Sequence, residues 1–416
     1  MVNPPTRTNA WLLKNGRTLE VDRPHDIVIE GDRIGAGPPA PGAEVLDLEG
    51  AVVLPGLVEA HIHLDKALLL ERTPSREGTL QEAIQLTAAA KRHFTPKDIA
   101  TRAEQVLRMA IRHGTTAMRT HVEVDPVVGL TGLEAIRDLR DRYREAIDLQ
   151  LVAFPQDGIH NLPGTEALLR EALRTGATVV GGCPYTDQNP AAHIRTVFDL
   201  AQEFDADVDL HLDFFDDPTH LHIRQVVAET EARGWQGRVA VGHLTEVAAL
   251  SPAERRDLFA AIRGAGIHVI TLPATDLYLM GRKDDRNVRR GLAPVKEMLS
   301  GGITVAYASN NIRNAFTPFG SADLIQIGLI LAIAGHLGAE EQIRTILRMG
   351  TEHAARILRL ADYGLHQGCR ADLVVFDTPR LTDIIAAQPE KRYVFKAGRL
   401  TVENQRTTRF HFEEVT

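Results

Sequence analysis

The feature that most constrains the fold is an eightfold alternation of short apolar, β-rich runs with longer runs of helical periodicity. Buried apolar strands joined by helices form parallel sheets, and eight such units predict a closed (β/α)8 barrel. The alternative is an open doubly wound sheet. That fold would carry a glycine-rich phosphate turn after its first strand, and the sequence has none there. The predicted strands are residues 58–65, 115–124, 149–158, 178–187, 207–215, 238–246, 268–276 and 304–311.

The two ends of the chain have a different pattern, with short strands and turns. Residues 8–50 contain "WLLKNGRTLE" and "DIVIEGDRIGA", and residues 368–402 contain "GCRADLVVFD" and "YVFKAGRL". Neither end can bury a core alone, so we expect them to pack together as one small β-domain beside the barrel. The predicted divisions are residues 1–55 and 363–416 for the two parts of this domain, and residues 56–362 for the barrel.

Composition limits the classes of partner. The 416 residues include 47 Lys and Arg against 55 Asp and Glu, and a net charge of −8 argues against nucleic acid and anionic membranes. The N-terminus lacks the apolar run of a signal peptide, and the longest apolar stretch, "IGLILAIAG", is too short to span a bilayer. The two cysteines form neither a zinc pattern nor a disulfide framework. We therefore expect a cytoplasmic protein, monomeric or homo-oligomeric, that acts on a small molecule.

Histidines recur where the predicted strands end, on the face of a (β/α)8 barrel that carries active sites. His61 and His63 are two residues apart on the first strand, so their side chains share a face. His121, His211 and His243 lie near the ends of the second, fifth and sixth strands. Some of the 17 histidines would fall at strand ends by chance, but five on one face predict a metal site. Three neutral imidazoles suffice for zinc and leave one position open for water.

Several segments resemble a known family. "LPGLVEAHIHLD", the later histidines and "GCRADLVVFD" resemble the amidohydrolase superfamily. Four further segments are similar to its cytosine deaminase branch, which includes aminohydrolases of s-triazine degradation. The resemblance covers almost the whole chain and implies a barrel with a flanking β-sandwich built from both termini. The four segments are "RTHVEVD", "LQLVAFPQDGI", "LMGRKDDRNVRRGLAPVKEML" and "TPFGSADLIQIG".

The resemblance also implies functional residues. One divalent metal ion, zinc or iron, would be held by His61, His63 and His211. His243 would polarise the substrate or the reaction intermediate, and Gln156 matches a substrate-binding amide of the family.

Two positions depart from the pattern of the branch. The deaminases have a proton-transferring glutamate three residues after the strand-five histidine, and here that residue is Phe214. They also have a metal-binding aspartate at the end of strand eight, and here it falls on Asn310, with Asn311 beside it. Because each lost acid or base role typically costs about 10²–10⁴ in rate, we do not expect an unmodified deaminase mechanism.

Other groups near the strand ends are candidates for the missing roles. Glu246 follows His243 by three residues and could carry a proton with it. Lys66 directly follows the paired histidines, and Arg313 could bind a carboxylate or a carbonyl-rich substrate together with Asn311. Phe214 could stack on a planar ring. The alternative role is barrel packing for Phe214. For the charged groups, and for the further strand-exit acids Asp213, Asp216 and Asp276, it is a solvated loop charge or a partner that supports a neighbouring site residue.

The leading hypothesis is a metal-dependent hydrolase that cleaves a non-peptide C–N bond of a small cyclic amide, an amidine or a related heterocycle. One alternative is a metal-poor isomerase, lyase or hydrolase on the same scaffold. Another is a catalytically inactive homologue that binds a small molecule.

Overall fold

The computed structural model describes residues 9–411. The chain divides into two compact units. One consists of Met1–Gly56 together with Gly364–Thr416, and the other is Leu57–Tyr363.

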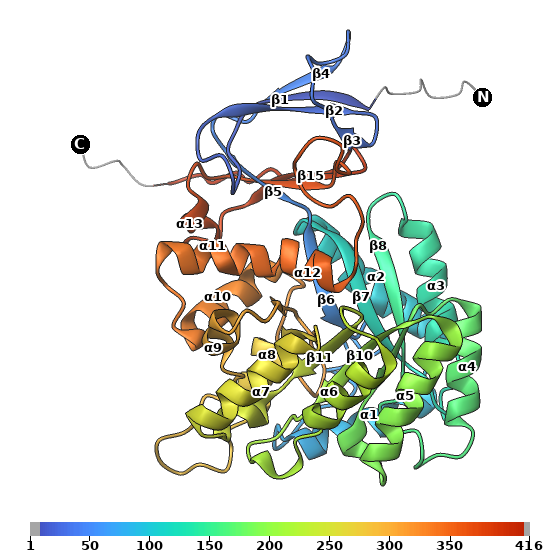
Figure 1. Ribbon diagram of the computed structural model, residues 1–416. Coiled ribbons are helices and arrows are strands. Elements are labelled where there is room, and N and C mark those ends of the chain that lie inside the picture. The colour runs from blue at the N-terminus through green and yellow to red at the C-terminus, as the bar shows by residue number, and fades with distance from the viewer. Residues whose placement is uncertain (1–8, 412–416) are drawn as a thin grey trace, which may run out of the picture. The chain divides into compact units, whose positions relative to one another are not determined.

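The larger unit is built around an eight-stranded parallel sheet, with the strands in sequence order (Figure 1). An isolated parallel bridge between Ile62 and Asn310 joins the last strand to the first and closes the sheet. The predicted (β/α)8 barrel is therefore confirmed. Its strands are β6 (Leu57–Ile62), β7 (Thr115–Glu123), β8 (Asp148–Phe154), β9 (Val179–Gly182), β10 (Asp207–Leu212), β11 (Val239–His243), β12 (His268–Thr271) and β13 (Val305–Tyr307).

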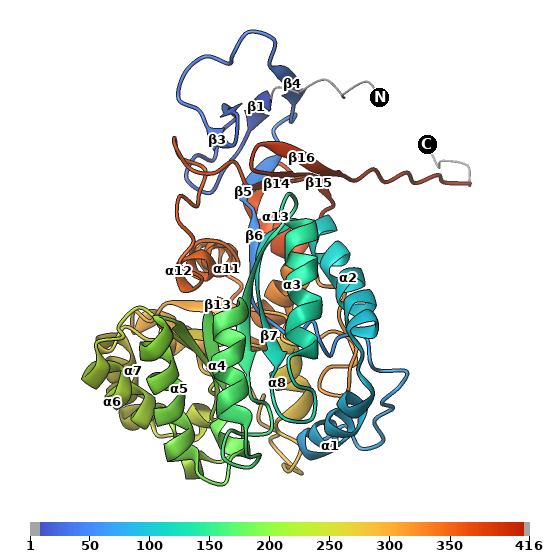
Figure 2. The same cartoon turned by 90° about the vertical axis from the view of Figure 1, so that its right-hand side faces the viewer.

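Helices cover the outer face of the barrel. In Figure 2, α3, α4 and α5 lie outside the strands, and the first two contact β8. Local signals fix where helices begin: Ser251 accepts a bond from the Glu254 backbone N–H in a capping box that opens α7. The helices of the larger unit are α1 (Leu80–Ala90), α2 (Pro96–Arg112), α3 (Thr131–Tyr143), α4 (Thr165–Thr175), α5 (Pro190–Phe204), α6 (Ile223–Arg233), α7 (Pro252–Gly264), α8 (Pro273–Leu279), α9 (Val295–Ser300), α10 (Leu324–Gly335), α11 (Glu340–Met349) and α12 (Glu352–Ile357). Short 3-10 turns are η1 (Lys91–His93), η2 (Pro184–Thr186), η3 (Pro218–His220) and η4 (Thr245–Ala249).

The interior of the barrel changes from small and apolar to charged along its axis. Alanines from several strands, such as Ala117, Ala240 and Ala306, form one apolar cluster with α12. These small side chains leave room for the fully buried Arg119, whose Nη1 lies 2.9 Å from Asp209 Oδ2. The Asp209 carboxylate in turn reaches the histidines at the strand ends. Buried charges of this kind require partners, and these two supply each other.

A β-bulge interrupts the first barrel strand. Glu59 pairs with Met118 whereas Ile62 pairs with Thr120, so β6 contains one residue more than β7 over this interval. The side chain of Ala60 joins the apolar cluster of the barrel, and that of its neighbour His61 lies near Asp209. The bulge therefore turns two consecutive side chains toward the interior, which strict alternation along a strand would not allow.

The smaller unit consists of two four-stranded sheets from both ends of the chain. Leu13 and Ile29 of one sheet share an apolar core with Leu373 and Phe395 of the other, so the two sheets form a sandwich. One sheet has β1 (Ala10–Gly16), β2 (His25–Glu30), β3 (Arg33–Ile34) and β4 (Glu44–Asp47), and the other has β5 (Val52–Pro55), β14 (Leu373–Phe376), β15 (Lys391–Lys396) and β16 (Arg399–Glu403). Helix α13 (Leu381–Ala386) belongs to the same unit.

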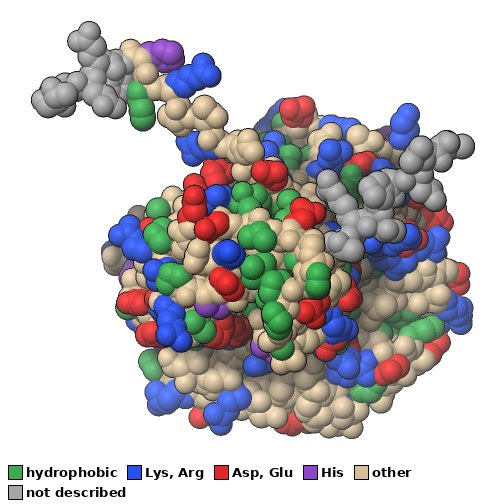
Figure 3. Space-filling model, turned by 90° about the horizontal axis from the view of Figure 1, so that it is seen from above, with side chains coloured by type: hydrophobic (Ala, Val, Ile, Leu, Met, Phe, Trp, Pro, Cys, Tyr) green, Lys and Arg blue, Asp and Glu red, His purple; other side chains and the backbone are tan. Residues whose placement is uncertain are grey.

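The surface carries charges of both signs. Lys and Arg are interspersed with Asp and Glu on the face in Figure 3. Among the described residues, no helix combines the length and the apolar character that crossing a bilayer requires.

The sandwich core predicts a large effect for Phe395, which is fully buried and meets the Trp11 ring edge-on at 5.2 Å between centroids. Phe395→Ala should lower the free energy of unfolding by about 3–5 kcal/mol, because it leaves a cavity between the sheets. Chemical denaturation measures the change. The matched control is Val45→Ala in the same unit, where the side chain is 60% exposed, and it should cost less than about 1 kcal/mol. Equal effects of the two changes would contradict a shared core.

Candidate active site

Four buried histidines meet at the carboxyl ends of the barrel strands: His61 in β6, His63 directly after it, His121 in β7 and His211 in β10. The Nε2 atom of His211 lies 3.1 Å from that of His61 and 3.0 Å from that of His63. His121 stacks against His61, with ring centroids 4.0 Å apart. His61, His121 and His211 also each offer one nitrogen, and these nitrogens lie within 4.8 Å of one another. The three imidazoles predicted to form the site are thus close neighbours.

These histidines have the chemistry of a cation site. Burial, together with repulsion from His121, lowers the pKa of His61 to about 3. Burial and neighbouring cations also lower the pKa values of His63 and His211 well below the ordinary value. Neutral imidazole is the form that binds metals. The side-chain oxygen of Asn310, which lines the same cavity, is buried without a hydrogen-bond partner among the described residues. Three imidazoles and one amide oxygen fit a divalent cation.

Asp209 is a functional candidate that sequence reasoning missed. Its Oδ1 lies 3.2 Å from His121 Nε2 and 3.7 Å from His61 Nδ1. Burial opposes its ionisation, but His121, His61 and Arg119 hold the pKa of Asp209 well below the usual range. The signal was present, because Asp209 precedes His211 by two residues and so shares its strand face. A carboxylate behind an imidazole orients the ring and raises its basicity.

His243 is held by a second carboxylate. Its Nδ1 lies 2.6 Å from Oδ1 of the fully buried Asp276, whose Oδ2 accepts the Leu272 backbone N–H at 3.2 Å. The bond to Asp276 leaves Nε2 as the nitrogen of His243 that can face the cavity. The Phe214 ring stacks on the other side of the imidazole, with centroids 3.8 Å apart and planes at 24°. His243 is therefore oriented by one polar and one apolar neighbour.

Lys66 is the only lysine or arginine among the described residues that line the cavity. Its Nζ donates to Gln156 Oε1 at 2.7 Å and to Glu123 Oε1 at 2.9 Å. Lys66 is 1% exposed, and the Phe316 ring centroid lies 5.2 Å from Nζ. A buried ammonium group with two fixed acceptors presents its charge at a defined point.

These groups surround one small cavity of about 10 Å³, which is room for about one water molecule. Most of the predicted site residues line it, and His61 lies directly beside His211 at its edge. Its apolar wall comes from Phe214, Phe316 and Leu80, which belong to a cluster that includes the buried face of α1. The lining residues are His63, Lys66, Leu80, Gln156, Tyr185, His211, Phe214, His243, Thr275, Asn310, Asn311 and Phe316.

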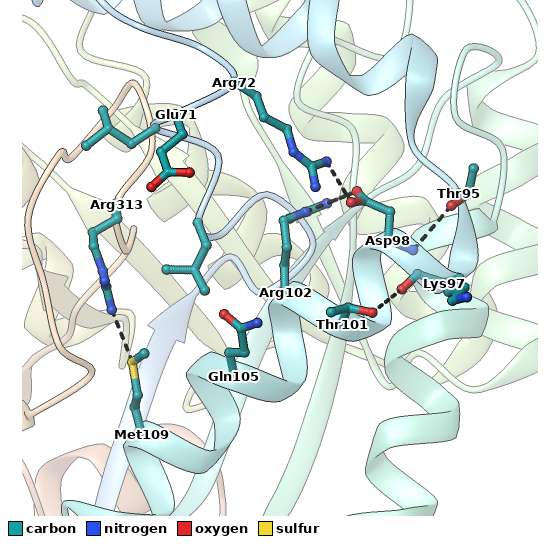
Figure 4. Close-up of a pocket in the computed structure, with 12 residues that line it drawn as sticks. Glu71, Arg72, Thr95, Lys97, Asp98, Thr101, Arg102, Gln105, Met109 and Arg313 are labelled. Carbon is teal, nitrogen blue, oxygen red and sulfur yellow. Dashed lines mark hydrogen bonds and ion pairs between the residues drawn. The ribbon is translucent and has the colours of Figure 1, made fainter.

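Two predicted residues lie elsewhere. Glu246 is buried in η4, with its backbone N–H donating to Asp213 O at 3.2 Å, and it does not line the cavity. Arg313 lines a separate pocket of about 590 Å³ and donates from Nη2 to Met109 Sδ at 3.4 Å (Figure 4). It adopts φ of +48° in the turn after β13.

The amides after β13 divide between the cavity and the turn. Asn310 and Asn311 line the cavity. Asn314 instead stabilises the turn: its Nδ2 donates to Asn311 Oδ1 at 2.8 Å, and its Oδ1 accepts the Phe316 N–H at 3.0 Å. Part of this polar stretch is thus structural, which the sequence alone did not separate.

Comparison with known proteins identifies the family. Residues 44–402 match the model described as amidohydrolase family. The chain is 31% identical over 406 residues, 95% of its length and 97% of the relative's, to N-isopropylammelide isopropyl amidohydrolase of Pseudomonas sp. strain ADP. It superimposes on a crystal structure of 5-methylcytosine deaminase from Klebsiella pneumoniae with a TM-score of 0.91 and 28% identity, covering 96% of this chain and 99% of that one.

A second solved structure, N-isopropylammelide isopropylaminohydrolase from Burkholderia multivorans, gives a TM-score of 0.84 and 30% identity, with 95% and 98% of the chains covered. The predicted resemblance to the cytosine deaminase and triazine branch is confirmed. These relatives are hydrolases of C–N bonds. The chain belongs to the amidohydrolase family, and it is a hydrolase of that family.

Proposed function

We propose that this protein hydrolyses a non-peptide C–N bond of a small cyclic amide, amidine or related heterocycle, with a divalent metal ion held by His61, His63 and His211. The observation that carries the proposal is that the Nε2 atoms of His61 and His63 lie 3.1 Å and 3.0 Å from the Nε2 atom of His211 at one cavity. Relatives along the whole chain support the substrate class, since their names specify a substituted ammelide and 5-methylcytosine.

Zinc or iron bound there would act as a Lewis acid and lower the pKa of water to about 7. The protein's own groups divide the remaining tasks. His243, with Asp276 behind it, accepts a proton or hydrogen-bonds a developing oxyanion, because the carboxylate stabilises the charged imidazolium. Lys66 and Gln156 form the polar wall that binds carbonyl or ring-nitrogen groups of the substrate.

The apolar wall defines the other side of the substrate. None of the described residues that line the cavity is acidic, so the position of Phe214 offers no carboxyl group that could transfer a proton to a ring nitrogen. Phe214 and Phe316 instead suit a planar ring or an apolar substituent on the scissile nitrogen. We therefore propose that the best substrates are carbonyl-rich heterocycles that carry such a substituent. Asn310 and Asn311 hydrogen-bond their polar edge.

The metal assignment predicts that His61→Ala will sharply lower the content of bound divalent metal, because one of three imidazole ligands is lost. Elemental analysis of protein purified without chelator measures the content per chain. The control is His93→Ala, since His93 is an exposed histidine outside the cluster, and it should leave the metal content unchanged. Equal metal in wild type and His61→Ala would refute the site, and no metal in the wild type would favour the metal-poor alternative.

The role of His243 predicts a kinetic effect without loss of fold. His243→Ala should reduce kcat by at least about 10², because a positioned proton acceptor or oxyanion donor is removed. Asp276→Asn should give a smaller loss, since the imidazole remains but its orientation is less fixed. Steady-state rates are compared with the circular dichroism spectra of each variant. If the His243→Ala variant turns over substrate at the wild-type rate, His243 has no role in catalysis.

The altered carboxylate positions predict poor deamination of cytosine. Ammonia release should stay below about 1 s⁻¹ for the wild type, while compounds from a library of N-substituted cyclic amides and amidines are hydrolysed faster. Phe214→Glu and Asn310→Asp should each restore little on their own, because such residues act as a unit. Asn310→Asp should still raise metal affinity, since it adds a negative ligand. Fast cytosine deamination by the wild type would mean that another acid acts. A wild type that turns over no member of the library would favour an inactive binding protein.

A further inference from the structure

A buried lysine outside the cavity forms an ion cluster that the proposed reaction does not use. Lys91 is the first residue of η1, directly after α1, and is 3% exposed. Its Nζ lies 3.1 Å from Glu123 Oε2 and 2.5 Å from Asp157 Oδ2, and it also donates to Asp125. Burial alone would lower the pKa of Lys91, but the three carboxylates outweigh it and raise this pKa above its ordinary value.

Glu123 connects this cluster to the cavity. Its Oε2 accepts from Lys91, and its Oε1 accepts from Lys66 at 2.9 Å, so one carboxylate bridges two ammonium groups. Burial opposes ionisation of Glu123, yet the two lysines lower its pKa to about 2. The Glu123 backbone N–H also donates to Asp65 Oδ2 at 2.8 Å, which ties the end of β7 to the residue before Lys66.

The same cluster fixes one end of the helix that covers the cavity. Helix α1 runs from Leu80, which lines the cavity, to Ala90, which precedes Lys91. Leu80 and Ala83 pack with Phe214 in one apolar cluster. Lys91 therefore anchors the carboxyl end of α1 to residues that follow β7 and β8.

We propose that Lys91 is a positioning residue for the Lys66 ammonium group and acts on it through Glu123. With Lys91 in place, one oxygen of Glu123 accepts from Lys91 and the other accepts from Lys66. Lys66 Nζ then stays directed at Gln156. Without Lys91, Glu123, Asp125 and Asp157 repel one another with no cation between them. Glu123 then turns or takes up a proton, and the Lys66 side chain loses its anchor.

This inference rests on the proposed function only in giving Lys66 a role in substrate binding. The first test is a double-mutant cycle on hydrolysis of the best compound from the library. Lys91→Met should reduce kcat/KM by about 10²-fold, the usual size for a misplaced binding group, while metal content stays at the wild-type level. In a Lys66→Met background the same change should have almost no further effect, because Lys91 acts through Lys66. Additive losses would overturn the inference and assign Lys91 to general stability.

Controls separate charge from bulk. Arg92→Met removes an exposed cation next to Lys91 and should leave kcat/KM unchanged. Lys91→Arg retains the positive charge and should recover a large part of the loss. If Lys91→Met does not fold, the double variant Lys91→Met, Asp157→Asn removes one of the repelling carboxylates and takes its place in the cycle.

The second test does not depend on finding a substrate. A crystal structure of the Lys91→Met variant should show that Glu123 has rotated and that Lys66 Nζ has moved from its 2.7 Å contact with Gln156 Oε1. An unchanged Lys66–Gln156 contact would overturn the inference even if the protein is an active hydrolase. Conversely, displacement of Lys66 in a chain that hydrolyses no library compound would support it while the proposed function failed.

Discussion

The closure of the barrel between β6 and β13 is the constraint on which the rest of the site depends. The His63 N–H donates to Asn310 O, and the Asn310 N–H donates to His61 O, both at 2.9 Å, so one residue after the last strand fixes both paired histidines. Asn310 adopts φ of +59°, a left-handed conformation that asparagine tolerates better than most residues. The backbone of Asn310 thus joins the first and last strands, and its side-chain oxygen remains available to the cavity.

Acidic groups surround the cavity without lining it. Asp209 holds His61 and His121, Asp276 holds His243, and Glu123 holds Lys66. Each carboxylate contacts a side chain that can bind metal, proton or substrate. Its negative charge therefore affects the cavity only through that side chain. A cation bound by neutral imidazoles would retain its full charge there, and that strengthens its Lewis acidity. On the proposed function, these carboxylates would tune the imidazoles and Lys66 rather than ligate the cation.

Local signals in the sequence predicted the fold, because each strand and helix shows its own periodicity. They also placed His63, His211 and His243 at the cavity, since the carboxyl ends of parallel barrel strands lie on one face, whereas Gln156 was identified through the family resemblance. Contacts between distant strands could not be predicted. No local pattern shows that Asp276 pairs with His243, or that Lys91 bridges toward Lys66 through Glu123. Arg313 lines a separate pocket, and no local pattern distinguishes it from Asn310 and Asn311, which line the cavity.

On the proposed function, the positions of the groups that can carry a proton limit the kind of leaving group that the enzyme can release. None of the described lining residues is acidic, and Lys66 Nζ is held by hydrogen bonds to Glu123 and Gln156. His243 is the imidazole set apart from the His61–His63–His211 group, and Asp276 stabilises its charged form. On the proposed function, the proton taken from water and the proton given to the departing nitrogen would therefore pass through the same ring. That sequence requires the departing nitrogen to lie near His243, on the side of the cavity where Phe214 stacks. The apolar wall and the proton carrier thus face the same atom, which favours a basic amine with an apolar substituent as the leaving group.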